Sequence, residues 1–338
     1  MAHMTNPLAT AEQLYQYRHL SSLPDDLQDV ILYATQCLTQ AAGVLLQLPQ
    51  SITAQANVVL ARYWLAETRP FMSNEFSVSL LTSKDSSIGR AHILLKDVSA
   101  ACIFIVTKLG SRPRSPRDIS NVYAYLLSSN SSFLRDKAAQ PPVNDPSSHY
   151  LSDSDYFAFH NRVLALEARI FYTLSFDTHV ALPHALAITY LQTLDFCNQP
   201  KEAISRRTIE YLNGALLSPQ VLYLTHQPNM LAVAAIYNAA KDLGARMPES
   251  EWWEVFDVER EELGFLVVAM RSLEGWARKQ QEELPWVADG MITRRAVREE
   301  LARRGIRNGS GNTSQVEDEE AALMRKMDEK MEQIEAQP

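Results

Sequence analysis

The chain has 338 residues, of which 46% are hydrophobic and 21% are charged, and its formal net charge is −8. This balance predicts a globular protein with room for two cores and excludes a largely disordered chain. The negative charge argues against binding that depends mainly on nucleic-acid phosphates, and no apolar run reaches the length of a membrane span.

The N-terminal residues 1–21 open with Met-Ala-His-Met, which resembles an expression scar, and carry few core signals. We expect an arm or a short helix here. Apolar residues at helical spacing predict helices over 25–45 and 52–67. The polar stretch 74–89 predicts a loop.

The central element is the helix from Leu94 to Leu109, which is apolar on nearly every side and should therefore lie inside other helices. Gly110 suits a left-handed stop after its last turn. Ser115 then predicts the N-cap of a second helix, with Pro116 at its first position and an end near Leu127.

A serine- and proline-rich segment, 128–155, exceeds the usual connection length and predicts an insertion, a mobile loop, or both. No period-two run bounded by hairpin turns follows, so the chain is predicted to be all-α. The further helices are expected over 156–174, from 183 to about 194, near 203–217, over 228–243 and over 257–279.

A short internal repeat joins the two halves. The run AACIFIVTKLGSRP, from Ala100, resembles AAIYNAAKDLGARMP, from Ala234. Each combines a small-residue helix, a lysine, a Leu-Gly stop, an arginine and a proline. Because the surrounding helix pattern also recurs, we favour duplicated halves over chance similarity between two buried helices.

The C-terminal residues change in character. Residues 294–307 are rich in arginine, 308–312 predict a flexible break, and 316–336 are charged with a thin apolar line at helical spacing. A solvated helix or frayed tail is favoured over a dedicated docking helix.

The sequence contains no pattern typical of catalysis. It has no glycine-rich phosphate loop, no HExxH and no G-x-S-x-G. His179 and His184 flank a helix start without metal-ligand spacing, so core or capping roles are expected. Cys37, Cys102 and Cys197 stand far apart and predict buried free thiols. We therefore expect binding rather than catalysis, with no metal and no cofactor.

Three motifs together carry a family resemblance: LLQLPQ at 45–50, TKLGSRPRSPRDISNV at 107–122 and the pattern L-x-F-D-x-H-V-x-L-P-H at 174–184. The chain resembles the cyclin family from about residue 24 to 277, and cyclin L most of all. The resemblance implies two tandem five-helix cyclin boxes, at 22–180 and 181–285, followed by a charged C-terminal helical tail at 286–338.

In this family the first box binds a cyclin-dependent kinase by clamping the C-helix of the kinase. A lysine from the central helix and a glutamate from the fifth helix bond to the kinase backbone. The resemblance places these roles on Lys108 and Glu167, with Leu109, Phe171 and Phe176 as the surrounding apolar contacts. Such a clamp holds the C-helix where its glutamate can pair with the catalytic-domain lysine.

The sequence departs from the family at three places. The pair of glutamates that usually follows the central lysine is replaced by Gly110 and Ser111, which bears on the strength and choice of kinase. The stretch 29–33 lacks the Met-Arg-x-x-Leu-like start of the substrate-recruiting patch of cell-cycle cyclins, as expected for a transcriptional type. The given sequence contains no arginine-serine tail of the cyclin L kind, either because that tail was removed or because the lineage lacks it, and the link to splicing is correspondingly weaker.

The resemblance implies a non-catalytic activating subunit of a nuclear cyclin-dependent kinase, similar to cyclin-dependent kinase eleven, in transcription or pre-mRNA splicing. Splicing or transcription factors are further implied partners, without direct binding to nucleic acid or membrane. A cyclin K, T, C or M-like subunit of another kinase and a kinase-independent scaffold stay open. A DNA-binding protein of the transcription-factor-IIB type is disfavoured by the net charge and the absence of a zinc-ribbon cysteine pattern.

Overall fold

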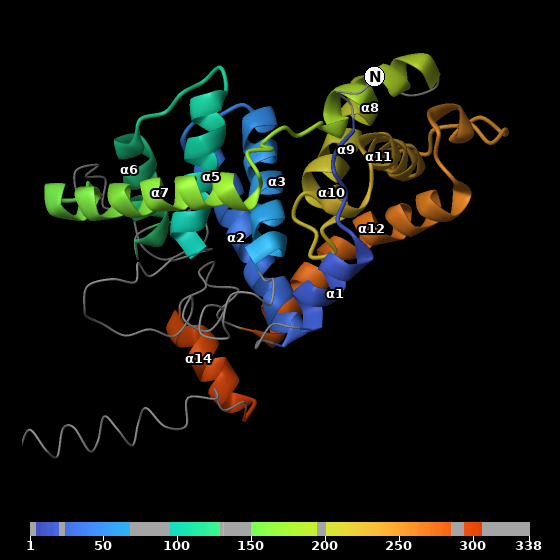
Figure 1. Ribbon diagram of the computed structural model, residues 1–338. Coiled ribbons are helices and arrows are strands. Elements are labelled where there is room, and N and C mark those ends of the chain that lie inside the picture. Colours follow the sequence, from blue (N-terminus) through green and yellow to red (C-terminus); the bar gives the residue numbers. More distant parts are fainter. Residues whose placement is uncertain are drawn as a thin grey trace, which may run out of the picture. The chain divides into compact units, whose positions relative to one another are not determined.

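The computed structural model describes residues 5–19, 24–67, 95–128, 131, 150–194, 201–284 and 294–305. Every regular element within these ranges is a helix (Figure 1), so the expected all-α fold is confirmed. The chain divides into a unit of residues 1–292 and a unit of residues 293–338, which are described separately.

The first helical bundle is built around one enclosed helix. Its members are α2 (Asp25–Leu45), α3 (Gln50–Glu67), α5 (Leu95–Leu109), α6 (Pro116–Leu127) and α7 (Asp153–Thr173). Helix α5 contacts the other four, and every residue from Asp97 to Thr107 is buried (Figure 1). An apolar surface on all sides forces such a helix into the core, as the sequence indicated.

A small polar network crosses this core. The hydroxyl of Ser99 on α5 lies 2.6 Å from Thr39 Oγ1 on α2 and 2.5 Å from Tyr123 Oη on α6. Burial raises the pKa of Tyr123, which keeps its hydroxyl protonated and able to donate. These hydrogen bonds join three helices, and they give each buried hydroxyl the partner that it needs in an apolar core.

The end of α5 differs from expectation. Gly110 does not adopt a left-handed conformation, and its amide donates to the carbonyl oxygen of Val106 at 2.9 Å. A Cβ at position 110 would lie 2.9 Å from that same oxygen, so close approach explains the glycine here. The left-handed stop does occur in the second half, at Gly244, where φ is +63°.

Serine caps set two other boundaries. Ser115 caps α6 as predicted, because its Oγ accepts a hydrogen bond from the amide of Asp118 at 3.1 Å. Helix α7 begins earlier than the sequence indicated, because Ser152 caps it. The Oγ of Ser152 accepts from the amide of Asp155 at 3.1 Å and donates to its carboxylate at 2.7 Å.

The second bundle repeats the arrangement. Its members are α8 (Pro183–Leu194), α9 (Lys201–Ala215), the single-turn α10 (Leu222–Thr225), α11 (Pro228–Asp242) and α12 (Arg260–Glu283), with a 3₁₀ turn, η3, at Glu254–Phe256. Helix α11 contacts α8, α9 and α12 and is buried along most of its length. It therefore holds the central place that α5 holds in the first bundle.

Several expected segments lie outside the described residues. They are the polar stretch 74–89, most of the segment 128–155, the break at 308–312 and the charged line at 316–336. Of the second unit, the structure describes α14 (Arg294–Arg303), whose Glu300 accepts hydrogen bonds from Arg303 and Arg304.

The N-terminal segment is more firmly built into the fold than its composition indicated. Asn6, only 5% exposed, exchanges two hydrogen bonds of 2.8 Å with the backbone of Ala181. Its own backbone exchanges two bonds of 3.0 Å with the side-chain amide of Gln227. Ala181 lies between α7 and α8, and Gln227 precedes α11. Asn6 therefore ties the connection between the bundles to the second bundle, ahead of α1 (Ala11–His19).

Replacing Asn6 with alanine tests this tie. The buried amide and carbonyl of Ala181 would lose their partners, so we expect the free energy of unfolding to fall by about 1–3 kcal/mol in urea denaturation. The matched control is Asn161→Ala on the exposed face of α7, with an effect within about 0.5 kcal/mol. Equal effects of the two substitutions would show that Asn6 does not support the fold.

Candidate functional site

Lys108 and Glu167 form an ion pair between α5 and α7. The Nζ of Lys108 lies 3.0 Å from Oε1 of Glu167, and their side chains are 57% and 10% exposed. Lys108 lies in the last turn of α5, where a cation is favoured by the helix dipole, and its Nζ lies 5.4 Å from the centre of the Phe104 ring. An ammonium has three donors, so a nearly buried carboxylate here orients a cation that still faces solvent.

Exposed apolar side chains adjoin this pair. Leu109 directly follows Lys108 and is 58% exposed. Phe171 lies one turn beyond Glu167 on α7, and its ring stacks on that of Phe176 with centroids 5.7 Å apart. Phe176 is itself 73% exposed. Large apolar groups left in water at one place are typical of a surface that binds another protein.

The turn after α7 holds Phe176 in this position. Ser175 and Phe176 adopt left-handed conformations, with φ of +51° and +61°, and the amide of Phe176 donates to the carbonyl oxygen of Phe171 at 2.8 Å. Two consecutive non-glycine residues in this region carry a strain of about 1 kcal/mol or more each. All five residues that the resemblance singled out thus lie at the end of α5 and in the C-terminal part of α7 and its following turn.

A second ion pair fixes the same two helices and was missed from the sequence. The Nε of Arg162 on α7 lies 2.8 Å from Oδ2 of Asp97 in the first turn of α5. The Asp97 side chain is completely buried and that of Arg162 is 30% exposed. An aspartate within an otherwise apolar helix was the available signal. Together the two pairs hold α7 across both ends of α5.

These two ion pairs should differ in their effect on stability. Arg162→Ala leaves the buried Asp97 carboxylate unpaired and should cost about 3–5 kcal/mol. Lys108→Ala removes an ammonium that is 57% exposed and leaves a carboxylate that still reaches solvent, so it should cost less, about 1–2 kcal/mol. Urea denaturation measures both, and Asp97→Ala/Arg162→Ala should be less destabilised than Arg162→Ala alone. A double variant as unstable as the single one would show that packing of the arginine, not pairing, dominates.

The second bundle carries a polar cluster at the equivalent place. Pairing the two repeats without gaps from Ala100 and Ala234 sets Asp242 opposite Lys108. Asp242 is the last residue of α11, and Lys108 is the last but one of α5. The charge at this position is therefore reversed between the two bundles.

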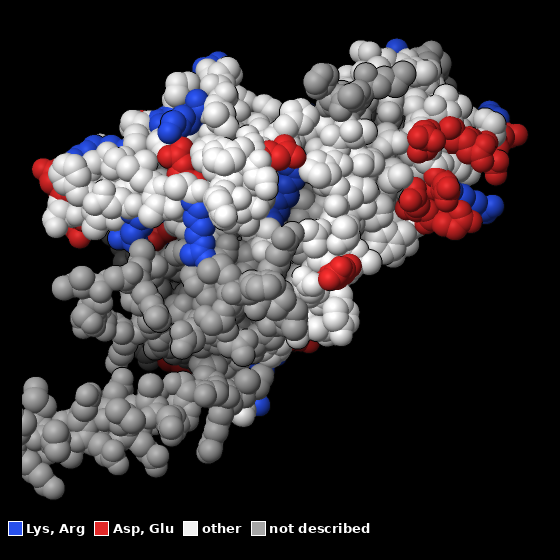
Figure 2. Space-filling view, in the orientation of Figure 1, with Lys and Arg blue, Asp and Glu red and all other residues white. Residues whose placement is uncertain are grey.

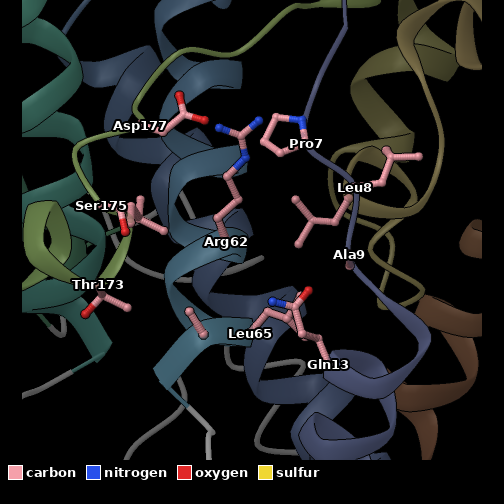
Figure 3. Close-up of a pocket in the computed structure, with 12 residues that line it drawn as sticks. Pro7, Leu8, Ala9, Gln13, Arg62, Leu65, Thr173, Ser175 and Asp177 are labelled. Atoms are coloured by element: carbon pink, nitrogen blue, oxygen red, sulfur yellow. The ribbon is translucent and has the colours of Figure 1, made fainter.

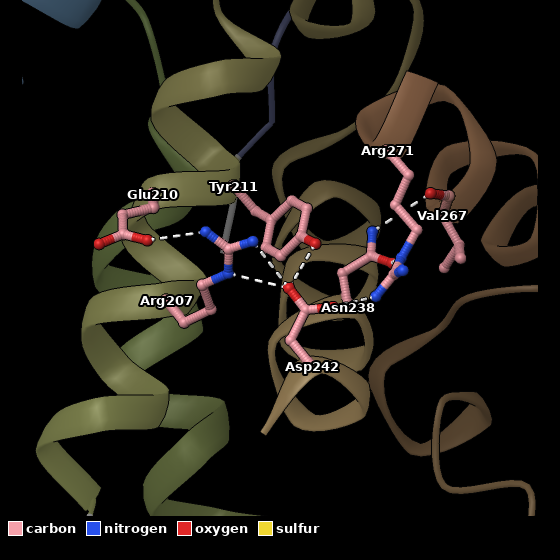
Figure 4. A network of polar contacts seen from close by, with 7 residues as sticks. All are labelled: Arg207, Glu210, Tyr211, Asn238, Asp242, Val267 and Arg271. Atoms are coloured by element: carbon pink, nitrogen blue, oxygen red, sulfur yellow. Dashed lines mark hydrogen bonds and ion pairs between the residues drawn. The ribbon is translucent and has the colours of Figure 1, made fainter. Parts of the chain in front are cut away.

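The carboxylate of Asp242 is enclosed by partners from its own bundle (Figure 4). It accepts hydrogen bonds from Arg207 Nε at 2.9 Å, from Tyr211 Oη at 2.7 Å and from Arg271 Nη2. Arg271 also donates to Asn238 Oδ1 at 2.7 Å. This cluster joins α9, α11 and α12, and its central charge is already satisfied.

The cluster should make the second bundle acid-sensitive. Partial burial would raise the pKa of Asp242, but hydrogen bonds from Tyr211 and Arg207 and the charge of Arg271 hold it below its usual value. The contribution of Asp242 to the free energy of unfolding is therefore complete above its pKa in the unfolded chain, about 3.9. It is lost as pH falls through the lower pKa of Asp242 in the folded protein.

We expect Asp242→Asn to lower the free energy of unfolding by about 1–3 kcal/mol at neutral pH, with a smaller difference from wild type as pH falls below about 4. Glu249→Gln, at a side chain 93% exposed, is the control and should have little effect. Urea denaturation over this pH range measures both, and a pH-independent difference for Asp242→Asn would contradict the assignment.

A pocket of about 230 Å³ lies between the N-terminal segment, α3 and the turn after α7 (Figure 3). Arg62, only 9% exposed, donates from Nη1 to the carbonyl oxygen of His179 at 2.7 Å and from Nη2 to Asn6 Oδ1 at 3.4 Å. Burial lowers the pKa of Arg62, and the charge of Asp177 partly offsets this. Because the arginine bonds the chain's own residues, we assign it to the junction between the bundles.

The histidine and cysteine residues considered from the sequence lie in settings typical of structural roles. The Nε2 of His184 lies 3.0 Å from Oδ1 of Asn213, and burial lowers the pKa of this histidine. Cys37 and Cys102 are free, and burial raises the pKa of Cys37 to about 11, while Cys197 lies outside the described residues.

Two further observations concern ligands and membranes. In the described ranges, no group of three or more histidine, cysteine, aspartate or glutamate side chains is arranged to hold a metal ion. Across the same ranges, no helix combines the length and apolar character of a membrane span.

Sequence comparison identifies relatives, although no family model matches the chain. Cyclin-L2 of Homo sapiens is 29% identical over 244 residues, which cover 72% of this chain and 39% of that protein. Cyclin-L1 of Gallus gallus is 28% identical over 263 residues, covering 77% and 42%. An uncharacterized cyclin-L1-like protein of Schizosaccharomyces pombe is 33% identical over 178 residues, covering 53% and 65%. The chain spans less than half the length of the two vertebrate relatives.

Solved structures share the fold. A chain of the crystal structure of the yeast RNA Pol II CTD kinase CTDK-1 complex matches with a TM-score of 0.57 at 14% identity, covering 89% of this chain and 84% of that one. A chain of the CAK complex from Chaetomium thermophilum bound to ATP-gamma-S matches with a TM-score of 0.51 at 15% identity, covering 90% and 93%. The resemblance drawn from the motifs is thus confirmed: this chain is similar to the cyclin L proteins, and it shares its all-helical fold with these two solved chains.

Proposed function

We propose that this chain is a non-catalytic regulatory subunit that binds and activates a cyclin-dependent kinase. The observation that carries the proposal is the Lys108–Glu167 pair, in which a nearly buried carboxylate holds an exposed ammonium at the end of the central helix. Similarity to cyclin L and the shared fold support it.

The geometry suits a clamp on a helix of the partner. Two donors of Lys108 remain for backbone carbonyl groups of the kinase, while Glu167 orients the ammonium. Leu109 and the stacked rings of Phe171 and Phe176 offer apolar surface on which the kinase C-helix can pack. Fixing that helix keeps its glutamate in reach of the catalytic-domain lysine, which phosphoryl transfer requires.

The similarity to cyclin L favours a partner like cyclin-dependent kinase eleven and a nuclear role in transcription or pre-mRNA splicing. The second candidate within this class is the subunit of another transcriptional kinase, because Gly110 and Ser111 replace the acidic pair usual at this surface.

Co-purification with the catalytic domain of cyclin-dependent kinase eleven tests the proposal, with phosphorylation of an RNA polymerase C-terminal repeat peptide as the activity. Other transcriptional kinases are tested in parallel. We expect Lys108→Ala/Glu167→Ala to weaken binding about a hundredfold, as for a central interface pair, and to abolish activation.

The matched control is Glu274→Ala/Arg278→Ala, which removes an exposed ion pair of 3.0 Å on α12 and should leave binding unchanged. A clamp variant that binds and activates like wild type would contradict the assigned roles. Binding without activation by the wild type would favour a scaffold.

A further inference from the structure

The turn between α5 and α6 is strongly basic. Residues 108–118 contain four basic residues and one acidic residue, and the same stretch in the second repeat, 242–252, contains one basic and three acidic residues. We call residues 110–117 the basic turn. Basic side chains gather over this end of the first bundle, and acidic side chains gather over η3 and the start of α12 (Figure 2).

The charges of the basic turn are only partly neutralised. Arg117 pairs with Asp153 at 2.6 Å. Arg112 is exposed, and among the described residues it has no acidic partner. Arg114 is half-buried and donates from Nη2 to the backbone carbonyl of Gln47 at 3.4 Å, and within the described ranges no carboxylate pairs with it. Arginine side chains that lack an internal carboxylate can bind one from a partner through a pair of parallel hydrogen bonds.

The second repeat shows that a basic turn without acidic partners is not a general feature of this position in the fold. Arg246, which the repeat sets opposite Arg112, lies 3.7 Å from Glu249 within an acidic surface. Among the described residues, Arg112 therefore lacks the acidic partner that Arg246 has in the second repeat.

The basic turn continues directly from the proposed interface. It begins one residue after Leu109, and the bond from Arg114 to Gln47 tethers it to the turn between α2 and α3. The close approach of Gly110 to the Val106 carbonyl restricts larger residues at its first position. A partner that binds Lys108 and Leu109 would therefore also contact the basic turn, which is held in a fixed position.

We propose, resting on the proposed function, that the basic turn binds an acidic segment of the kinase beside its C-helix and so selects which kinases this chain accepts. Continuity with the apolar site and the chain's net charge of −8 favour this protein partner over nucleic acid. Charges at such an edge act on the association rate and on specificity.

The test uses the full chain and the purified kinase domain that the wild type binds, with the dissociation constant measured at about 0.05 M and 0.3 M salt. We expect Arg112→Glu to raise the constant about tenfold at low salt, mainly by slower association, and to flatten its salt dependence. Arg246→Glu is the matched control in the second bundle and should remain within about twofold of wild type.

The outcomes separate this inference from the proposed function. If no kinase binds the wild type, both fail. If the wild type binds, Lys108→Ala/Glu167→Ala does not, and Arg112→Glu matches wild type at both salt concentrations, the clamp stands and the acidic segment is refuted. A single-stranded RNA oligonucleotide serves as a further probe, and loss of RNA binding by Arg112→Glu with unchanged kinase binding would also overturn the inference.

Discussion

The burial of α5 on every side is the constraint on which the first bundle depends. From Asp97 to Thr107 this helix has no solvent-facing side, so its polar groups there depend on partners from neighbouring helices. Asp97 meets Arg162, Ser99 meets Thr39 and Tyr123, and Lys108 meets Glu167. These contacts join α5 to α2, α6 and α7. The two ion pairs help to fix the position of α7, and with it the positions of Phe171 and of the exposed Phe176 in the following turn.

The two bundles differ in whether the charged residue near the end of the central helix is exposed to solvent or enclosed by partners. Lys108 and Asp242 lie in the last turns of equivalent central helices. Lys108 pairs with Glu167 and stays more than half exposed, whereas Asp242 is enclosed by two arginines and a tyrosine. An internally satisfied charge gains little from a new partner, while an exposed cation on a rigid helix end can donate further bonds. The same framework thus supports a binding surface in one bundle and a structural cluster in the other.

The N-terminal segment adds a constraint from outside the bundles. Asn6 bonds both the connection after α7 and the residue before α11, and it also accepts a bond from Arg62. The connection after α7 contains the turn that carries Phe176. A short polar segment near the chain start is thereby coupled through Ala181 to the region of the candidate site.

The sequence by itself determined the helical class, the central place of α5 and the serine cap of α6, because periodicity and capping are local properties. The five candidate residues were implied by the family resemblance of its motifs, and their binding roles stay a prediction. The sequence misplaced the start of α7 and the conformation of Gly110, and it missed Asn6 and the Asp97–Arg162 pair. Those depend on partners distant in the chain, as does the pairing of Lys108 with Glu167, 59 positions apart. Only the tertiary structure decided which charges are enclosed and which face solvent, because burial and pairing follow from packing rather than from residue type.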